Sequence, residues 1–316
     1  MISKPLSEGL MNEKLAELAK WITRFSTSDG TYQTPFPALS LIRNSENAVP
    51  VYTVYEPSIC LVAQGSKLVL LANETYRYGP SQYFAASVDL PISGQVTDAS
   101  SEHPYLAIRL QINPQQVLEF IEVTDHEGIA QDKSSRGLYV SCATSDMLDA
   151  FLRLVRLLET PNDLAVLAPL ISREILYRAL QDRQGNALRQ MAPGAGYAAL
   201  IAEVIRRIRE SYNQPLRIDD LAREVGMSSS SLHRRFRDVT AMSPLQFQKQ
   251  IRLQEARQML LNEPVQAAEV AFRVGYESPS QFNREYARMF GKPPIGDIRQ
   301  LKTHSLSGTT GKSYKS

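Results

Sequence analysis

The segment VAFRVGYESPSQFNREY, residues 270–286, repeats the earlier segment LAREVGMSSSSLHRRF, residues 221–236, with one residue inserted in the turn. In each copy, apolar residues at helical spacing lead to a glycine, Gly226 or Gly275. Glycine adopts the left-handed conformation that a tight turn after a helix demands. A second helix follows, so each copy is predicted to be a helix-turn-helix unit.

The second helix of each unit is predicted to have one apolar and one basic face. A serine is expected to cap it, Ser228 or Ser229 in the first copy and Ser278 in the second. The other face is polar and basic, which suits a helix that enters the major groove of DNA. The apolar faces, expected to be core, consist of Leu232, Phe236, Val239, Phe282, Tyr286 and Met289.

The charge distribution favours the same interpretation. The net charge is only +2, but residues 1–196 hold 16 Lys and Arg against 21 Asp and Glu, whereas residues 197–302 hold 17 against 12. A chain that is acidic in front and basic behind prompts a search for nucleic-acid contacts, although basic surface is also ordinary solvated surface. No run of 18 apolar residues and no secretory signal pattern occurs, so a cytoplasmic location is expected.

The pattern of strand-like and helix-like segments along the chain predicts an α+β protein. Short β-rich runs with Gly, Pro and Asn between them favour a small antiparallel barrel that could hold one ligand. Helical periodicity then follows, with Ser145 and Asp146 placed to cap, Pro161 to start a helix and Pro169 to kink or end one. The expected divisions are an amphipathic helix in 1–30, a sensor barrel at 31–112, a helical connector, able to dimerise, at 113–185, a linker at 186–196, the helix-turn-helix domain at 197–302 and a disordered tail at 303–316.

These residues resemble the AraC/XylS transcriptional regulators, whose C-terminal domain holds two helix-turn-helix units joined by one long helix. Residues 245–262 would be that helix, and 270–294 is similar to the family signature. The front half is similar to an AraC subgroup with a cupin-like N-terminal domain, through YEPSICLVAQGSK (55–67), YRYGPSQYFAASVDLPISGQV (76–96) and YLAIRL (105–110). The resemblance implies promoter or operator DNA and RNA polymerase as partners, a small-molecule effector and a possible homodimer. It leaves activation and repression open.

The resemblance also assigns roles to residues of the two second helices. Arg234 and Arg284 occupy equivalent repeat positions and are expected to bind guanine in bidentate fashion. Phosphate contacts are expected from Arg237, Asn283 and Arg288. The full base-reading set is Ser230, His233, Arg234, Ser280, Gln281 and Arg284.

The ligand of the front half is left open by the sequence. Cys60 could be a reactive thiol or an inert buried one, and Cys142 is likewise expected to be reduced and buried. Arg77, Arg109 and Tyr83 could bind a small anion or pair with surface acids. The speculative ligand-binding set is Cys60, Tyr83 and Arg109.

No cofactor, metal site or catalytic residue is predicted. His103 and His126 do not form the histidine cluster that a metal cupin needs, and motifs such as GxSxG, HExxH and the phosphate-binding P-loop are missing. A non-enzymatic regulator is therefore expected. The alternative is a cupin-type enzyme with an accessory DNA-binding domain, which stoichiometric iron, zinc or manganese in the purified protein would favour.

Overall fold

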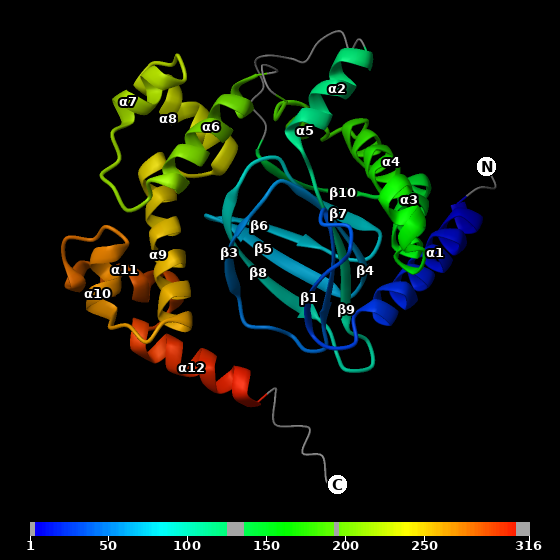
Figure 1. Ribbon diagram of the computed structural model, residues 1–316, viewed down its shortest axis with the longest axis horizontal. Helices are drawn as coiled ribbons and strands as arrows, with labels where there is room; N and C mark the ends of the chain where they lie inside the picture. The colour runs from blue at the N-terminus through cyan, green and yellow to red at the C-terminus, as the bar shows by residue number, and fades with distance from the viewer. Residues whose placement is uncertain (1–3, 125–135, 193–195, 308–316) are drawn as a thin grey trace.

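A computed structural model describes residues 4–124, 136–192 and 196–307 of the chain (Figure 1). Two antiparallel sheets form the centre, one group of helices covers them on one side, and a second group lies on the other. This is the predicted α+β arrangement of an N-terminal cupin-like unit and a C-terminal helical domain. None of the helices in the described part of the chain combines the length and the apolar character needed to cross a bilayer.

The larger sheet has six strands in the order β1-β2-β9-β4-β7-β10, and the smaller sheet has four in the order β3-β8-β5-β6. Nearest neighbours pair antiparallel, and Cys60 lies opposite Arg109 where β4 meets β9. The strand bounds are β1 Gly30–Gln33, β2 Leu39–Asn44, β3 Val51–Tyr55, β4 Ser58–Gln64, β5 Ser66–Leu71, β6 Glu74–Tyr78, β7 Gln82–Ala86, β8 Leu90–Asp98, β9 Tyr105–Gln111 and β10 Leu138–Cys142.

Both faces of β4, inside the six-stranded sheet, are buried, which explains the apolar run ICLVA. Successive side chains of a strand point to opposite faces. In β4, Ile59 and Leu61 face the helical layer, whereas Cys60 and Val62 face the space between the two sheets. The sequence therefore predicted the strand, but only the sheet pairing reveals which face each side chain takes.

The first helical layer contains α1 (Lys4–Phe25), which packs on this sheet, α3 (Ser145–Arg156), which packs on α1, and α4 (Pro161–Leu180), which packs on α3; the three share one core with the sheet. The N-cap of α3 is Thr144, not Ser145 or Asp146 as predicted. The Thr144 side chain accepts a hydrogen bond from the backbone N–H of Met147 at 3.2 Å. Pro161 starts α4 as predicted. Pro169 does not end α4. The helix continues through this exposed position, where water can bind the backbone carbonyl group that lacks a partner because proline has no N–H.

The front half also differs from expectation in its connecting segments. The region 113–185, predicted to be helical, contains α2 (Pro114–Thr124) and also strand β10, which pairs with β7. The expected linker at 186–196 begins with α5 (Asn186–Arg189), whose Leu188 is fully buried. Small and apolar residues there fill a core instead of forming a loose connection.

The second helical group contains two repeated units. The first is α7 (Ile218–Glu224) with α8 (Ser229–Thr240), and the second is α10 (Ala267–Arg273) with α11 (Pro279–Phe290). They are joined by α9 (Pro244–Asn262) and flanked by α6 (Tyr197–Glu210) and α12 (Pro294–Ser307). α12 extends five residues into the segment expected to be a disordered tail, and residues 308–316 lie outside the described part.

The two units also end alike. The C-cap of α8 is Ala241, with φ 62°, and the C-cap of α11 is Gly291, with φ 77°. Both positions are left-handed, a conformation that costs an L residue about 1–2 kcal/mol and glycine very little. The first unit therefore carries backbone strain that the second unit avoids.

We expect Ala241→Gly to raise the free energy of unfolding by up to about 1 kcal/mol, because the strain is relieved at the cost of one half-buried methyl group. Gly291→Ala is the matched control and should lower it by about 1 kcal/mol, since the new methyl group meets open space and only the strain remains. Urea unfolding of the full chain measures both. Equal effects of the same sign would contradict this account.

Candidate nucleic-acid interface

The helices α8 and α11 are placed by identical local geometry. Each has 12 residues and follows a helix of 7 residues. The turns are made by Gly226 and Gly275, whose φ values are 67° and 89°. A Cβ atom on Gly275 would lie 2.2 Å from the backbone oxygen of Asn213, so glycine is required there by space as well as by conformation.

The N-termini of both helices are capped by serine. The Ser228 side chain accepts the N–H of Ser231 at 3.3 Å, and Ser278 accepts the N–H of Gln281 at 3.5 Å. Ser228, not Ser229, is thus the cap in the first unit. The buried faces are those predicted, except that Met289 is only half-buried: Leu232, Phe236, Val239, Phe282 and Tyr286.

The opposite faces of α8 and α11 are open to solvent. Every residue for which a DNA contact is predicted is exposed, whereas Arg235, also on α8, is buried with its guanidinium carbon 3.8 Å from the centre of the Tyr197 ring. The Gln281 amide donates a hydrogen bond to Glu285 at 3.3 Å. The exposed set is Ser230, His233, Arg234, Arg237, Ser280, Gln281, Asn283, Arg284 and Arg288.

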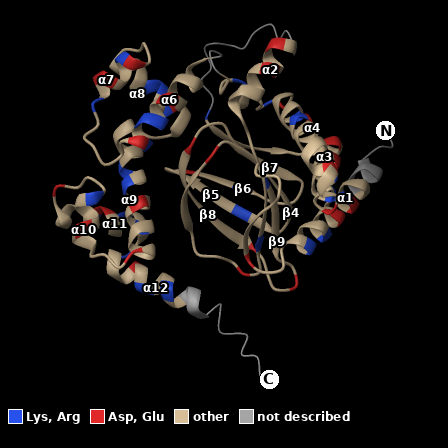
Figure 2. Ribbon diagram, viewed as in Figure 1, with Lys and Arg blue, Asp and Glu red and all other residues tan. Residues whose placement is uncertain are grey.

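The outward arginines of α8 and α11 differ from other arginines of this domain in their pairing. Within the described residues, none of the four arginines predicted to contact DNA lies in an ion pair. By contrast, Arg206, Arg223 and Arg273, on α6, α7 and α10, each pair with a neighbouring carboxylate. Figure 2 shows the mixture of basic and acidic residues over these helices. Unpaired cations remain available for a polyanion.

The relative position of the two units is fixed by α9 and by Arg252 on it. The guanidinium donates hydrogen bonds to the backbone oxygens of Tyr212 at 2.6 Å, Gly275 at 2.7 Å and Gln214 at 2.9 Å. One side chain therefore ties the loop before the first unit to the turn of the second. With 19 residues, α9 is about 28 Å long.

The second unit has a buried polar centre. Arg257 of α9 donates to both carboxylate oxygens of Asp297 at 2.7 and 2.8 Å, and the Tyr286 hydroxyl donates to Asp297 at 2.8 Å. Burial, together with the hydrogen bond to Asp297, raises the pKa of Tyr286 well above its usual range. The network holds α9, α11 and α12 together, which keeps α11 rigid behind its exposed face.

The unit formed by the two sheets, called the β unit, touches the C-terminal end of α8. Arg136, just before β10, donates to the backbone oxygen of Arg237 at 2.6 Å and to Glu74 of β6 at 2.9 Å. The N–H of Gly137 donates to the backbone oxygen of Val239 at 2.9 Å. A cation at a helix C-terminus satisfies carbonyl groups that lack partners within the helix.

The β unit also touches the C-terminal end of α11. The hydroxyl of Tyr52, on β3, donates to the backbone oxygen of Met289 at 2.9 Å. The Tyr52 ring packs edge-on against Phe290, with ring centres 4.8 Å apart, and lies under the guanidinium of Arg257. Both α8 and α11 are thus held at their C-terminal ends by the same β unit. No sequence pattern indicated either contact, because the partners are more than 100 residues apart.

The structure separates the three residues proposed for ligand binding. Cys60 and Arg109 face the space between the sheets, where a cavity of about 300 Å³ lies next to Arg109. Tyr83 lies on the opposite face of β7, with its ring centre 6.0 Å from that of Tyr139. Arg77 is exposed. Sequence reasoning missed Lys67, a second cation of this cavity, because an apolar strand with one lysine gives no indication of its face.

The two cysteines are free and differ in exposure. Burial raises the pKa of the Cys60 thiol, so the neutral form dominates. A neutral, buried thiol is a poor nucleophile, and the reactive-thiol hypothesis gains no support from the geometry. Cys142 is exposed, which corrects the expectation that it is buried; it ends β10, an edge strand of the six-stranded sheet.

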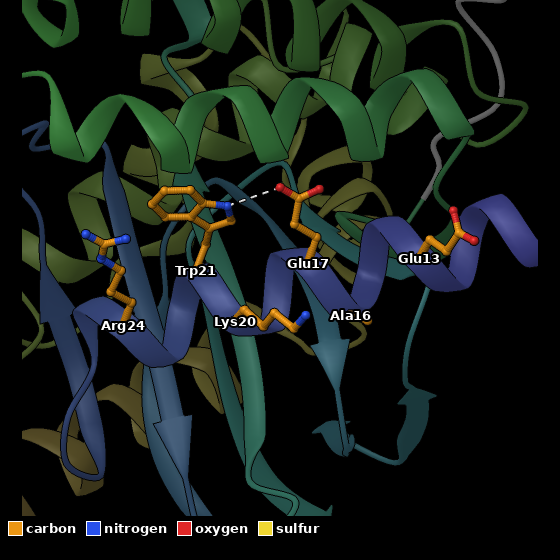
Figure 3. Close-up of a pocket in the computed structure, with 6 residues that line it drawn as sticks. All are labelled: Glu13, Ala16, Glu17, Lys20, Trp21 and Arg24. Carbon is orange, nitrogen blue, oxygen red and sulfur yellow. Dashed lines mark hydrogen bonds between the residues drawn. The ribbon is translucent and has the colours of Figure 1, made fainter.

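A shallow hollow runs along the outer face of α1 (Figure 3). Several of its polar groups already have partners: the indole N–H of Trp21 donates to Glu17 at 3.3 Å, and Glu17 also pairs with Arg156 of α3. Arg24 pairs with Glu159. The hollow therefore fastens α1 to its neighbour and offers few free groups to a ligand.

No group of three or more His, Cys, Asp and Glu side chains is arranged to hold a metal ion among the residues that the structure describes. His103 is described, whereas His126 lies outside the described residues. The cupin-type enzyme alternative has no supporting observation in this part of the chain.

Two sequence profiles match the chain. The profile described as AraC-type transcriptional regulator N-terminus matches residues 35–187, and a helix-turn-helix domain profile matches residues 221–300. The chain belongs to the AraC/XylS family. The two matches cover the β unit with its helices and the repeated C-terminal units, in the order that the family resemblance implied.

Individual relatives agree with this assignment. The HTH-type transcriptional regulator GlxA of Rhizobium meliloti is 32% identical over 34% of this chain and 32% of its own length. The HTH-type transcriptional regulator ArgR of Pseudomonas aeruginosa is 28% identical over 55% of this chain and 52% of its own length. The chain thus spans about a third to a half of these curated relatives.

A solved structure shares the fold over most of the chain. Unsaturated fatty acid bound ToxT from Vibrio cholerae superposes with a TM-score of 0.54 at 10% identity, covering 88% of this chain and 97% of that protein. At this identity the likeness concerns the fold alone. It shows that a β unit followed by helical units of this kind forms one known architecture.

Proposed function

We propose that this AraC/XylS family protein is a sequence-specific DNA-binding transcription regulator whose β unit senses a ligand. The observation that carries the proposal is the pair of unpaired outward arginines, Arg234 and Arg284, at equivalent positions of two repeated helices. A rigid connection by α9 and Arg252 lets both helices meet one duplex. Regulation rather than catalysis is the activity that this arrangement supports.

The contacts with bases are proposed for the exposed residues in the first turns and the middle of α8 and α11. Arg234 and Arg284 can each bind O6 and N7 of a guanine, a contact worth about 1–3 kcal/mol of discrimination. Gln281 can bind adenine when it leaves Glu285. The remaining base contacts are proposed from Ser230, His233 and Ser280, and the phosphate contacts from Arg237, Asn283 and Arg288.

The partners and location are part of the same proposal. We propose promoter DNA and RNA polymerase as partners and the cytoplasm as the location. We propose a homodimer through α4, because Val166, Leu167 and Leu170 are 65%, 41% and 60% exposed on one stretch of that helix. Large exposed apolar patches mark interaction sites. A monomeric mass by light scattering, at concentrations that saturate DNA, would contradict the dimer.

The ligand signal is proposed to travel through strand β3. Val51 and Thr53 line the cavity, and Tyr52 between them contacts the end of α11. A ligand that shifts β3 therefore also shifts a DNA-facing helix. Arg136 offers a parallel connection from β6 to α8.

We expect Arg284→Ala to weaken binding to the selected operator by roughly 5- to 150-fold, which corresponds to the loss of one bidentate base contact. Binding to random DNA should fall much less. The operator is first obtained by selection from random duplexes, and affinities are measured by fluorescence anisotropy at one fixed salt concentration. Arg273→Ala is the matched control, since it removes an exposed arginine outside the DNA-facing helices. Equal losses on operator and random DNA would refute base reading.

The route through Tyr52 and Arg136 has its own test. A compound from a thermal-shift screen that alters operator affinity should still bind the double variant Tyr52→Phe, Arg136→Gln. The change in operator affinity that it causes should shrink toward zero, because both hydrogen-bonded connections are lost. Tyr177→Phe, on α4, serves as the control. An undiminished response of the double variant would show that the signal takes another path.

A further inference from the structure

We propose that the cavity between the two sheets binds a small organic carboxylate with an apolar body, and that Lys67 and Arg109 hold its carboxylate. This inference rests on the proposed sensing function and names the chemical class that the sensor takes. It follows from the charges, the burial and the size of one cavity, which lies next to strand β3.

The charge of the cavity is uncompensated. Its lining includes two cations and, among the described residues, no Asp or Glu, and neither cation takes part in an ion pair within the described part of the chain. Two like charges in an enclosed space are costly unless an anion accompanies them. The lining is Gly30, Thr31, Ile42, Asn44, Ala48, Val51, Thr53, Val54, Tyr55, Lys67, Ile92, Gly94, Val96 and Arg109.

The Lys67 side chain is laid over Gly94 on the neighbouring strand β8. A Cβ atom at Gly94 would lie 2.8 Å from the Cε and 3.3 Å from the Nζ of Lys67. The glycine therefore gives the lysine the room in which its amine reaches the cavity. Burial lowers the pKa of Lys67, and the charge of Arg109 acts in the same direction, so a bound anion would stabilise the protonated amine.

Arg109 is held so that part of its guanidinium stays available. Its Nε donates to the Ser40 hydroxyl at 3.3 Å, and its guanidinium carbon lies 6.0 Å from the centre of the Tyr55 ring. The Tyr55 hydroxyl is itself buried, with no hydrogen-bond partner among the described residues. An anion in this cavity would meet an ammonium, guanidinium N–H groups and a phenol, which are the donors that a carboxylate accepts.

The rest of the wall selects for an apolar body of limited size. A cavity of about 300 Å³ is at the small end of ligand pockets, which hold small organic molecules. An inorganic anion would leave the apolar wall exposed to water, whereas a carboxylate with an aromatic or branched body would bury that wall. The apolar wall is formed by Ile42, Ala48, Val51, Val54, Ile92 and Val96.

The test compares charged and neutral probes of equal shape on the full chain. Benzoate, phenylacetate and 3-methylbutanoate are titrated by calorimetry up to millimolar concentrations, beside their primary amides and inorganic phosphate. We expect at least one carboxylate to bind and its amide to bind roughly tenfold or more weakly, since a charge-assisted contact is lost. Absence of carboxylate binding, or equal affinity for the amide, would overturn the inference.

Variants locate the site. Lys67→Met should weaken the carboxylate roughly tenfold or more, Lys67→Arg should retain most of the affinity, and Lys20→Met, an exposed lysine on α1, should bind as the unaltered chain does. Circular dichroism verifies that each variant is folded. If Lys67→Met does not fold, Lys67→Arg together with Arg109→Lys decides: affinity for the carboxylate that is independent of both changes would place the ligand elsewhere and refute the site.

Operator binding is measured on the same samples, so that two failures can be told apart. Specific DNA binding without carboxylate binding would refute this inference and leave the regulator intact. Carboxylate binding without specific DNA binding would refute the proposed function and leave the cavity assignment standing.

Discussion

The fixed distance between the two helix-turn-helix units is the constraint on which the rest of the structure depends. It is set by α9 and by three hydrogen bonds from Arg252 to backbone oxygens of the flanking segments. Two exposed basic faces that moved independently would each bind DNA weakly. Held in one fixed arrangement, they can contribute jointly to one site, because the second contact becomes intramolecular.

The β unit adds a second constraint on the same helices. Arg136 and Gly137 contact the end of α8, and Tyr52 contacts the end of α11, while the faces proposed to meet DNA remain exposed. The cavity lies directly beside the strand that carries Tyr52. A sensor placed there can bias the orientation of the reading helices without covering them, which requires only a difference in ligand affinity between two arrangements.

The sequence predicted the features that repeat locally. Gly226 and Gly275, the serine caps and the apolar stripes depend on neighbours within a few residues, and their spacing alone indicated two helix-turn-helix units. Contacts between distant segments could not be predicted in this way. Arg252, Tyr52 and Arg136 resemble ordinary surface residues in the sequence. The alternation of β4 and β7 turns Cys60 toward the space between the sheets and Tyr83 toward the helical layer, and it becomes visible only when strand pairing is known. At the start of the expected linker, Ala187 and Leu188 are buried, which small and apolar residues in the sequence do not distinguish from a flexible connection.

Hydroxyl-radical footprinting of the full chain on its selected operator shows whether α8 and α11 bind one duplex together. We expect two protected segments on one face of the duplex, with centres about 10 base pairs apart, because the two helices are proposed to enter successive major-groove segments. A single protected segment, or two segments on opposite faces, would contradict simultaneous reading by the two helices.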